Sequence, residues 1–398
     1  MYQKRFIIAG TVLIFLFQLA CFSSAAVTNS ATMAPIVNSD VTDIQNSPMP
    51  VAPAAAQRCG NGICEKAENP LKCPADCTSQ KLPVEPGQEA SPAAAPTPDP
   101  QQPAVLYLGL MVHLEGWNDD QDQARFEQHA RLLDEYASLF ETYGAKLTLE
   151  SKEMTPGSAR WGDNILLQMQ QRGHGIGVHA DIGGEKNYPC RQMSADLRQR
   201  KLELEALGVT VRHLSGNVSA CDWVTASIDA GYAFTTGTVA YGLMSLPLAK
   251  RPVEYSSCPS PAACHQAYPT ELAGRLHPWR ANSGDDWIEP SANGRLVILP
   301  SSGGLKCMDE DQNGQSVTGK GCLYTREDID LFFNELDQAL TLLDPNQVNI
   351  YYNSWSFGDP LDQALLEEWL QRLKPYTDSG RVQWKTLPEM YDLYLAQQ

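Results

Sequence analysis

The chain has 398 residues, of which 30 are Lys or Arg and 47 are Asp or Glu, so its formal net charge at pH 7 is −17. A surface of this sign repels the phosphates of nucleic acids and of anionic lipids, which argues against both as partners. The sequence contains neither a phosphate-binding glycine loop nor a Gly-x-Ser-x-Gly elbow, so it does not indicate nucleotide-dependent or serine-hydrolase chemistry.

The N-terminus has the charged-then-apolar pattern of an export signal, because two basic residues precede an apolar run at 6–17. Cleavage after Ala25 or Ala26 would follow a cluster of small residues. The segment before Cys21 is instead similar to the end of a bacterial lipoprotein signal, although Gln18 departs from that pattern. We expect residues 1–26 to be a signal peptide and the mature protein to be secreted or held at the cell envelope. Attachment to the membrane through this terminus is the alternative to release.

Residues 27–58 and 78–103 are rich in Ala, Pro, Ser, Thr and Gln without apolar periodicity, so we expect both to be linkers. Between them, residues 59–77 carry four cysteines in a segment too small for a hydrophobic core. Two disulfides are expected there, with a four-thiolate zinc site or an acidic calcium site as alternatives. The segment resembles small Cys-Gly-Asn-Gly-x-Cys modules of secreted microbial proteins, and we interpret it as a spacer or attachment module.

Six cysteines remain after residue 78, an even number that is expected to be oxidised outside the cytoplasm. Sequence alone allows fifteen pairings of six cysteines. Short spacing favours two loop pairs and leaves a third, which gives Cys258 with Cys264, Cys307 with Cys322, and Cys190 with Cys221.

From residue 104 to the C-terminus apolar strands alternate with amphipathic helices. The predicted strands are 105–114, 145–150, 175–180, 209–214, 232–239, 295–299, 347–352 and 381–386. The predicted helices are 121–143, 161–172, 193–207, 222–230, 326–343, 361–373 and a last one from residue 388. This alternation predicts one α/β domain over 104–398, a (β/α) barrel of seven or eight mostly parallel strands.

Two of these strands end in a histidine followed two residues later by an acid. They are His113 with Glu115, and His179 with Asp181. Residues two apart on an extended chain point to the same side, so each pair is expected to face one cleft. In a barrel the carboxyl ends of the strands carry the site, which makes these four residues the candidate constellation. A lone strand-end histidine is more often structural, and the repetition is what favours a functional site.

Several segments resemble motifs of the polysaccharide deacetylase family, also called the NodB-homology family, over about 104–396. Residues 173–179 are similar to its Gly-His-Glu-Ile-Gly-x-His segment, whose last histidine binds a divalent metal. Further similar segments lie at 211–216, 230–232, 277–280 and 386–391. The resemblance implies a deacetylase-type distorted barrel, removal of acetyl groups from a carbohydrate, and a metal ligand at His179.

The departures from the family fall on its functional positions. The Thr-Phe-Asp-Asp-Gly motif aligns with residues 112–116, so Leu114 replaces the catalytic-base Asp and Glu115 replaces the metal-binding Asp. The second metal histidine aligns with Gly183, and the late histidine of the family falls near Ser301. The chain must therefore build its site from other residues if it is active.

A metal that activates water needs about three protein ligands and an open position. His113, Glu115 and His179 supply two imidazoles and a carboxylate, which is the composition of several hydrolytic zinc sites. We therefore predict a divalent metal, zinc in first place, with Asp181 as the base or as a partner of a ligand.

Arg212 and His213 are further catalytic candidates, since either side chain could stabilise an oxyanion or orient a carboxylate. A structural ion pair is the alternative for this segment. The leading function is an exported metal-dependent hydrolase that acts on a carbohydrate or a cell-envelope polysaccharide. The alternatives are a glycan-binding protein that has lost catalysis, and a glycosidase that uses Glu115 and Asp181 as its two carboxylates.

Overall fold

The structure, a computed structural model, describes residues 104–115, 118–185, 187–264, 275–300, 325–356 and 363–398. The signal, both linkers and the small cysteine module lie outside these residues, so the expectations for 1–103 stay predictions. The same holds for the pairing of Cys307 with Cys322 and for the position of Ser301.

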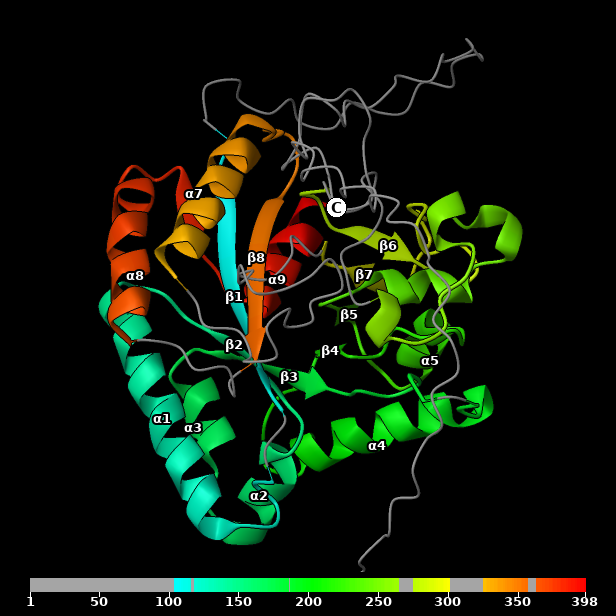
Figure 1. The fold of residues 1–398 in the computed structure, drawn as a ribbon, viewed down its shortest axis with the longest axis horizontal. Coiled ribbons are helices and arrows are strands. Elements are labelled where there is room, and N and C mark those ends of the chain that lie inside the picture. Colours follow the sequence, from blue (N-terminus) through cyan, green and yellow to red (C-terminus); the bar gives the residue numbers. More distant parts are fainter. Residues whose placement is uncertain (1–103, 116–117, 186, 265–274, 301–324, 357–362) are drawn as a thin grey trace, which may run out of the picture. The chain divides into compact units, whose positions relative to one another are not determined.

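The strands form one mostly parallel sheet that curves into a half-barrel (Figure 1). Its order is β6-β7-β5-β4-β3-β2-β1-β8, with β9 on β1, and only β6 runs antiparallel to its neighbour. The strands are β1 (Leu106–Leu114), β2 (Thr148–Ser151), β3 (Gly175–His179), β4 (His213–Ser215), β5 (Phe234–Thr235), β6 (Trp279–Ala281), β7 (Leu296–Ile298), β8 (Asn349–Ser356) and β9 (Val382–Trp384). The predicted parallel α/β fold is confirmed. Among the described residues no ladder joins β6 to β8, so the barrel is not closed.

Helices follow most strands and cover the outer face of the sheet, where α1, α7 and α8 lie over β1 and β8 (Figure 1). Buried aromatic side chains join these helices, since the rings of Phe140 on α1 and Phe332 on α7 both contact Trp369 on α8. The helices are α1 (Gln123–Thr142), α2 (Met154–Trp161), α3 (Ile165–Gln171), α4 (Met193–Glu205), α5 (Trp223–Asp229), α7 (Arg326–Thr341), α8 (Gln363–Asp378) and α9 (Leu387–Gln397).

Alternation along β1 separates two cores. Leu108, Leu110 and Val112 belong to the cluster shared with the outer helices. Met111 points the other way and packs with Phe234 and with residues of β7, β8 and α9. The last helix therefore fills the interior of the half-barrel. His113 lies two residues after Met111, so it continues the inner face toward the carboxyl ends of the strands.

Helix α9 is fixed at its start by local hydrogen bonds. Thr386 and Glu389 form a reciprocal capping box, in which each side chain bonds to the backbone of the other. The backbone N–H of Leu387 donates to the hydroxyl of Thr148 on β2 over 2.9 Å. A Cβ on Gly175 would lie 2.8 Å from Pro388, so glycine is needed where β3 passes the helix. The glycine-rich sequence of β3 thus allows α9 to approach the sheet.

The structure corrects several predicted elements. The predicted helix 161–172 corresponds to α3 alone, and α2 over Met154–Trp161 was not predicted. Gly162, which has a left-handed φ of 77°, lies between the two helices. The predicted strand 232–239 is only β5, because Gly237 takes a φ of 57° that ends the extended chain. Strand β6 was not predicted, since three residues give too short a pattern to recognise.

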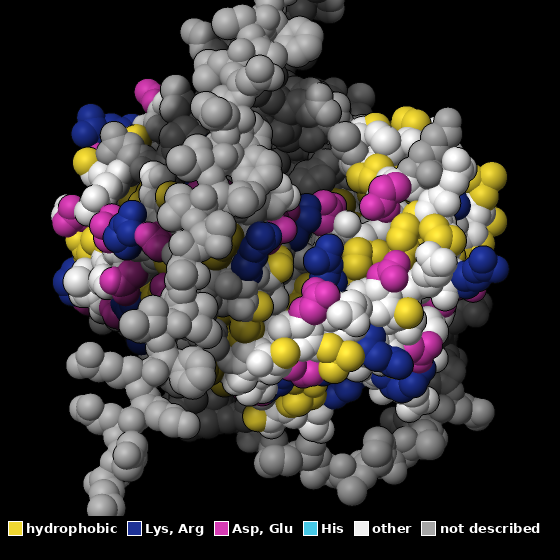
Figure 2. Space-filling view, turned by 90° about the horizontal axis from the view of Figure 1, so that it is seen from below, with side chains coloured by type: hydrophobic (Ala, Val, Ile, Leu, Met, Phe, Trp, Pro, Cys, Tyr) yellow, Lys and Arg dark blue, Asp and Glu magenta, His cyan; other side chains and the backbone are white. Residues whose placement is uncertain are grey.

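Basic and acidic side chains are interspersed on the face shown in Figure 2. Within the described residues, no helix combines the length and the apolar composition that a membrane crossing requires.

Candidate functional site

Two rows of polar side chains cross the inner face of the sheet near its carboxyl edge, where neighbouring parallel strands are in register. In the first row His113 on β1 is opposite Glu150 on β2. In the second row, two residues further along, His179 on β3 is opposite Ser215 on β4. Glu115 follows directly after β1 and belongs to the second row. The sequence therefore delivers polar groups from four strands to one place.

Glu115 contacts both predicted metal histidines. Its Oε2 lies 2.9 Å from Nε2 of His179, and its Oε1 lies 3.6 Å from Nδ1 of His113. The two imidazole rings lie against each other, with centroids 4.1 Å apart and planes tilted by 31°. The side chain of Glu115 is 27% exposed, so this contact lies at the solvent side of the cluster. The structure thus brings together the three residues that the sequence suggested as ligands.

Ser215 lies on the inner side of the same two rings. Its Oγ is 2.8 Å from Nδ1 of His179 and 3.3 Å from Nε2 of His113, and the serine is fully buried. Each histidine therefore has one nitrogen facing Ser215 and the other facing Glu115.

Glu150 closes the inner side of the cluster and is completely buried. Its Oε2 lies 3.2 Å from Nε2 of His113 without hydrogen-bond alignment, and that oxygen has no hydrogen-bond partner among the described residues. Its Oε1 accepts a short hydrogen bond from the hydroxyl of Thr236 and lies 3.4 Å from Nε2 of His213. Burying a carboxylate costs several kcal/mol, on the order of 3–5, unless it is paired. Glu150 is thus held in place by the polar groups of three other strand ends.

His213 lies deeper still, completely buried on β4 and stacked on Phe234 at a centroid distance of 4.7 Å. Neither ring nitrogen makes a hydrogen bond within the described part of the chain. A Cβ on Gly177 would overlap the imidazole ring, so β3 must carry glycine at this position. His213 is thus separated from solvent by the cluster above it, and direct contact with a substrate is not supported by this placement.

The charges of the cluster stabilise one another. Burial of the His113 ring lowers its pKa, but the neighbouring carboxylates of Glu115 and Glu150 outweigh burial and raise it to about 9. Burial raises the pKa of Glu115 and of Glu150, and the neighbouring imidazoles more than reverse this, so both carboxyl pKa values lie well below their usual range. In the metal-free protein the cluster therefore holds two carboxylates against at least one imidazolium at neutral pH.

Asp181 does not join this cluster. The chain leaves the extended conformation after β3, and Asp181 has a left-handed φ of 48°, so the alternation that would place it beside His179 no longer applies. Its side chain is 61% exposed, and it accepts a hydrogen bond of 2.7 Å from Nζ of Lys152. Asp181 therefore lies at the rim, where a substrate would arrive from solvent.

Arg212 lies away from the cluster. Its guanidinium forms a two-pronged ion pair with Asp392 of α9, at 2.5 and 2.9 Å, and stands over the ring of Tyr391. It also lines a pocket of about 420 Å³ at the amino ends of β3 and β4, together with His174 and Pro388. The structure thus favours the alternative interpretation of Arg212 as a structural ion pair.

Among the described residues, one group of side chains has ligand atoms close enough to share a metal ion. The atoms of His113, Glu150 and His179 all lie within 4.8 Å of one another. Glu115 contacts both of these histidines from the other side.

Glu150 and Ser215 were not predicted from the sequence. The available signal was a charged residue ending the apolar segment 147–150, which a parallel register would place beside the histidine of β1.

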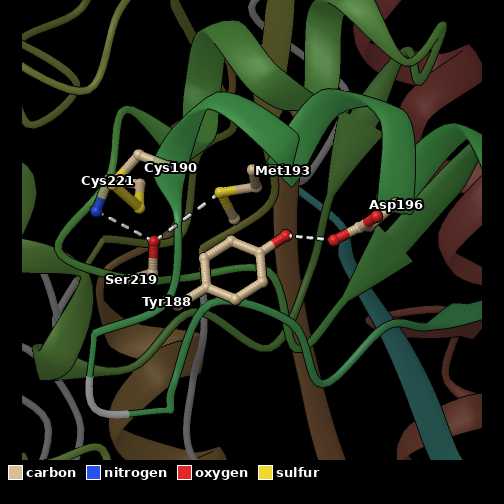
Figure 3. Close-up of a disulfide and its surroundings, with 6 residues drawn as sticks. All are labelled: Tyr188, Cys190, Met193, Asp196, Ser219 and Cys221. Carbon is tan, nitrogen blue, oxygen red and sulfur yellow. Dashed lines mark hydrogen bonds between the residues drawn. A yellow bond between two sulfur atoms is a disulfide. The ribbon is translucent and has the colours of Figure 1, made fainter.

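A disulfide joins the two loops that leave β3 and β4 next to the cluster, and it confirms the predicted pair Cys190 with Cys221 (Figure 3). The hydroxyl of Ser219 accepts from the backbone N–H of Cys221 and contacts the sulfur of Met193. The hydroxyl of Tyr188 donates to Asp196 over 2.5 Å. The loop that carries Asp181 is thereby tied to the loop that follows Ser215.

The predicted pair Cys258 with Cys264 is also present, in the irregular region between β5 and β6.

No protein family model matches the chain, and no curated protein matches its sequence. Among solved structures, one similar chain is assigned as a polysaccharide deacetylase from Mycobacterium smegmatis, with 15% identity, a TM-score of 0.48, and coverage of 78% of this chain and 96% of that one. Another is Puue allantoinase, with 12% identity, a TM-score of 0.44, and coverage of 76% and 95%. A third is assigned as a polysaccharide deacetylase from Pseudomonas aeruginosa, with 13% identity, a TM-score of 0.43, and coverage of 74% and 93%.

Proposed function

We propose that this domain is a metal-dependent hydrolase that removes acetyl groups from a carbohydrate. The observation that carries the proposal is the contact of one carboxylate, Glu115, with the outward nitrogens of two imidazoles, His113 and His179. The motif resemblance at residues 173–179 supplies the reaction class and the carbohydrate substrate.

The donor set fits a divalent metal of the zinc type. Two imidazoles and one carboxylate match the ligands of hydrolytic zinc sites, and three protein ligands leave a position open. In this proposal Nδ1 of His113, Nε2 of His179 and the carboxylate of Glu115 hold the ion. Glu150 is the alternative carboxylate ligand, since its ligand atom lies within 4.8 Å of those of both histidines. When bound, such a metal supplies Lewis acidity, which polarises a carbonyl and lowers the pKa of water.

A side chain of the protein itself accepts the proton that the reaction releases. Asp181, exposed at the rim and held by Lys152, accepts the proton of the attacking water in this proposal. The oxygen of that water bonds to the acyl carbon, and the bond from the acyl carbon to the sugar nitrogen or oxygen breaks. The products are acetate and the free amine or hydroxyl, which takes up a proton as it leaves.

The glycosidase alternative is less well supported. A glycosidase needs one carboxyl that stays protonated near neutral pH, which requires a raised pKa. The two histidines hold the pKa of Glu115 well below its usual range, so Glu115 is unsuited to the role of general acid. The site thus favours a metal over a pair of carboxyl groups that exchange protons.

Export from the cytoplasm is part of the proposal. It is supported by the charged and apolar N-terminal pattern and by the two disulfides among the described residues, since disulfides persist in oxidising compartments. A cell-envelope polysaccharide would then be within reach of the protein.

The test measures acetate released by the full mature chain, loaded with zinc, from N-acetylated glucosamine oligomers and from an O-acetylated xylan. We expect release from at least one of these substrates, and a loss of at least about 100-fold in His179→Ala. His277→Ala is the matched control, because His277 contacts the carbonyl of Val348 before β8 begins, at the other end of the sheet. If the zinc-loaded protein releases no acetate from either substrate, the deacetylase proposal fails.

A further inference from the structure

The metal histidines can serve the proposed site only if their outward nitrogens are free of protons, and two buried residues face the inward nitrogens. A neutral imidazole carries one proton, on either Nδ1 or Nε2, and the partner of one nitrogen decides the state of the other. In the proposed site His113 must carry its proton on Nε2, and His179 must carry its proton on Nδ1.

Glu150 selects the form of His113. A carboxylate oxygen only accepts hydrogen bonds, so a nitrogen held beside it is favoured in its protonated form. Nε2 of His113 lies 3.2 Å from Oε2 of Glu150, whose side chain is completely buried. The carboxylate is itself held by the hydroxyl of Thr236. When a metal occupies the position beside Glu115, the charge of Glu150 therefore favours the proton on Nε2 and leaves the lone pair of Nδ1 for the metal.

Ser215 selects the form of His179. Its hydroxyl oxygen lies 2.8 Å from Nδ1 of His179 and can accept the proton of that nitrogen. The same oxygen lies 3.3 Å from Nε2 of His113, so it can accept from both rings at once. The other ring nitrogen of His179, Nε2, faces Glu115 at 2.9 Å.

We propose that Glu150 and Ser215 are positioning residues, which place the protons of His113 and His179 on their inward nitrogens and thereby direct both lone pairs at one metal position. The proposal rests on the proposed metal site and adds to it the residues that prepare its ligands. Carboxylates and hydroxyls that hold the second nitrogen of a metal-bound histidine commonly change metal affinity by about 10- to 100-fold.

The experiment combines cobalt titration with histidine spectroscopy. Affinity for Co²⁺, read from its visible spectrum, is compared in the wild type, Ser215→Ala and Glu150→Gln. The controls are Ser227→Ala and Glu335→Gln, which remove a buried hydroxyl and a buried carboxylate outside the cluster. We expect affinity to fall about 10- to 100-fold in both test variants and to stay within about twofold in both controls. Thermal unfolding of all four variants separates loss of fold from loss of affinity.

Side-chain ¹H–¹⁵N spectra of histidine-labelled protein read the proton positions directly. With zinc bound, we expect the proton of His113 on Nε2 and that of His179 on Nδ1, with the latter resonance moved in Ser215→Ala and not in Ser227→Ala. Protons on the opposite nitrogens, or unchanged affinity in both variants, would overturn the proposal. If Glu150→Gln loses metal as completely as Glu115→Gln, Glu150 is a ligand rather than a positioning residue. If the wild type binds no metal, the proposed site itself fails, whereas metal binding by the wild type with unchanged affinity in both variants overturns this proposal alone.

Discussion

Glu115 and His179 are in contact across an intervening strand, with Oε2 and Nε2 2.9 Å apart. Their strands, β1 and β3, each pair with β2 and not with each other. The contact is possible because Glu115 extends past the end of β1, and because the inner face of a curved sheet brings strand ends toward one centre. This relationship places a carboxylate and two imidazoles around one point at the open edge of the half-barrel.

Substitution of Gly177 by Ala should destabilise the fold next to the site. A Cβ there would overlap the His213 ring, which is stacked on Phe234 and has no free space to enter. We expect Gly177→Ala to lower the free energy of unfolding by about 2–3 kcal/mol, measured by urea denaturation. Gly144→Ala is the control, because its φ is 70° but nothing lies within 4 Å of a Cβ there. It should cost about 1 kcal/mol from backbone strain alone. Equal losses in the two variants would show that the ring is not confined.

The free energy of unfolding of the domain should fall in mild acid because of His174. Burial lowers the pKa of His174 to about 4, because its Nδ1 accepts from the backbone of Leu147 and its ring has no contact with water. The unfolded chain binds a proton near pH 6.5, so the stabilisation is complete above about 6.5 and is lost as the pH falls toward 4. The loss amounts to about 3 kcal/mol.

His174→Asn tests this expectation, since an amide oxygen can accept from Leu147 and does not titrate. Unfolding free energies measured between pH 4 and 7 should fall less steeply in the variant than in the wild type. Glu141, whose pKa is lowered to about 2 by hydrogen bonds from Arg172, contributes its own loss only below about pH 4.5. Parallel curves for variant and wild type between pH 4 and 6.5 would show that His174 is not responsible.

The two described disulfides should stabilise the fold by different amounts. In the chain-entropy view a cross-link stabilises more when it closes a longer loop. Cys190 and Cys221 are 31 residues apart, whereas Cys258 and Cys264 are 6 apart. We expect loss of the first pair, through paired Cys→Ser changes, to cost about 4 kcal/mol and loss of the second to cost about 2 kcal/mol. A larger loss for the second pair in thermal unfolding would contradict the entropic explanation.

Much of this architecture follows from local patterns in the sequence. The apolar run of β1 and the glycine-rich β3 mark central strands because each is covered on both faces, and such strands need no long-range information to recognise. Local pattern is therefore enough to place His113, Glu115 and His179 at one edge of the sheet. The pair Cys190 with Cys221 follows from an even count of cysteines and from short spacing elsewhere.

Other parts of the site depend on register, which a single sequence does not determine. Glu150 meets His113 only because β1 and β2 align at that residue, and a shift of one position would turn Glu150 to the outer helices. Ser215 is an ordinary small residue in its segment, with nothing in the local pattern to single it out. Asp181 does not point into the cleft of His179 as the alternation predicts, because a single left-handed residue ends that alternation. The positions of Glu150, Ser215 and Asp181 thus depend on long-range strand pairing and on one left-handed backbone residue.

The metal content of the purified protein tests the central claim most directly. Elemental analysis and equilibrium dialysis against zinc are applied to the full mature chain, to His179→Ala and to Glu115→Gln. Glu203→Gln on α4, where the Glu203 side chain is 40% exposed, is the control. We expect close to one zinc per domain in the wild type and the control, and a loss of at least about 100-fold in affinity in both site variants. Wild-type protein that is isolated without metal and also fails to bind added zinc would contradict the hydrolase proposal and would leave glycan binding as the better explanation of the fold.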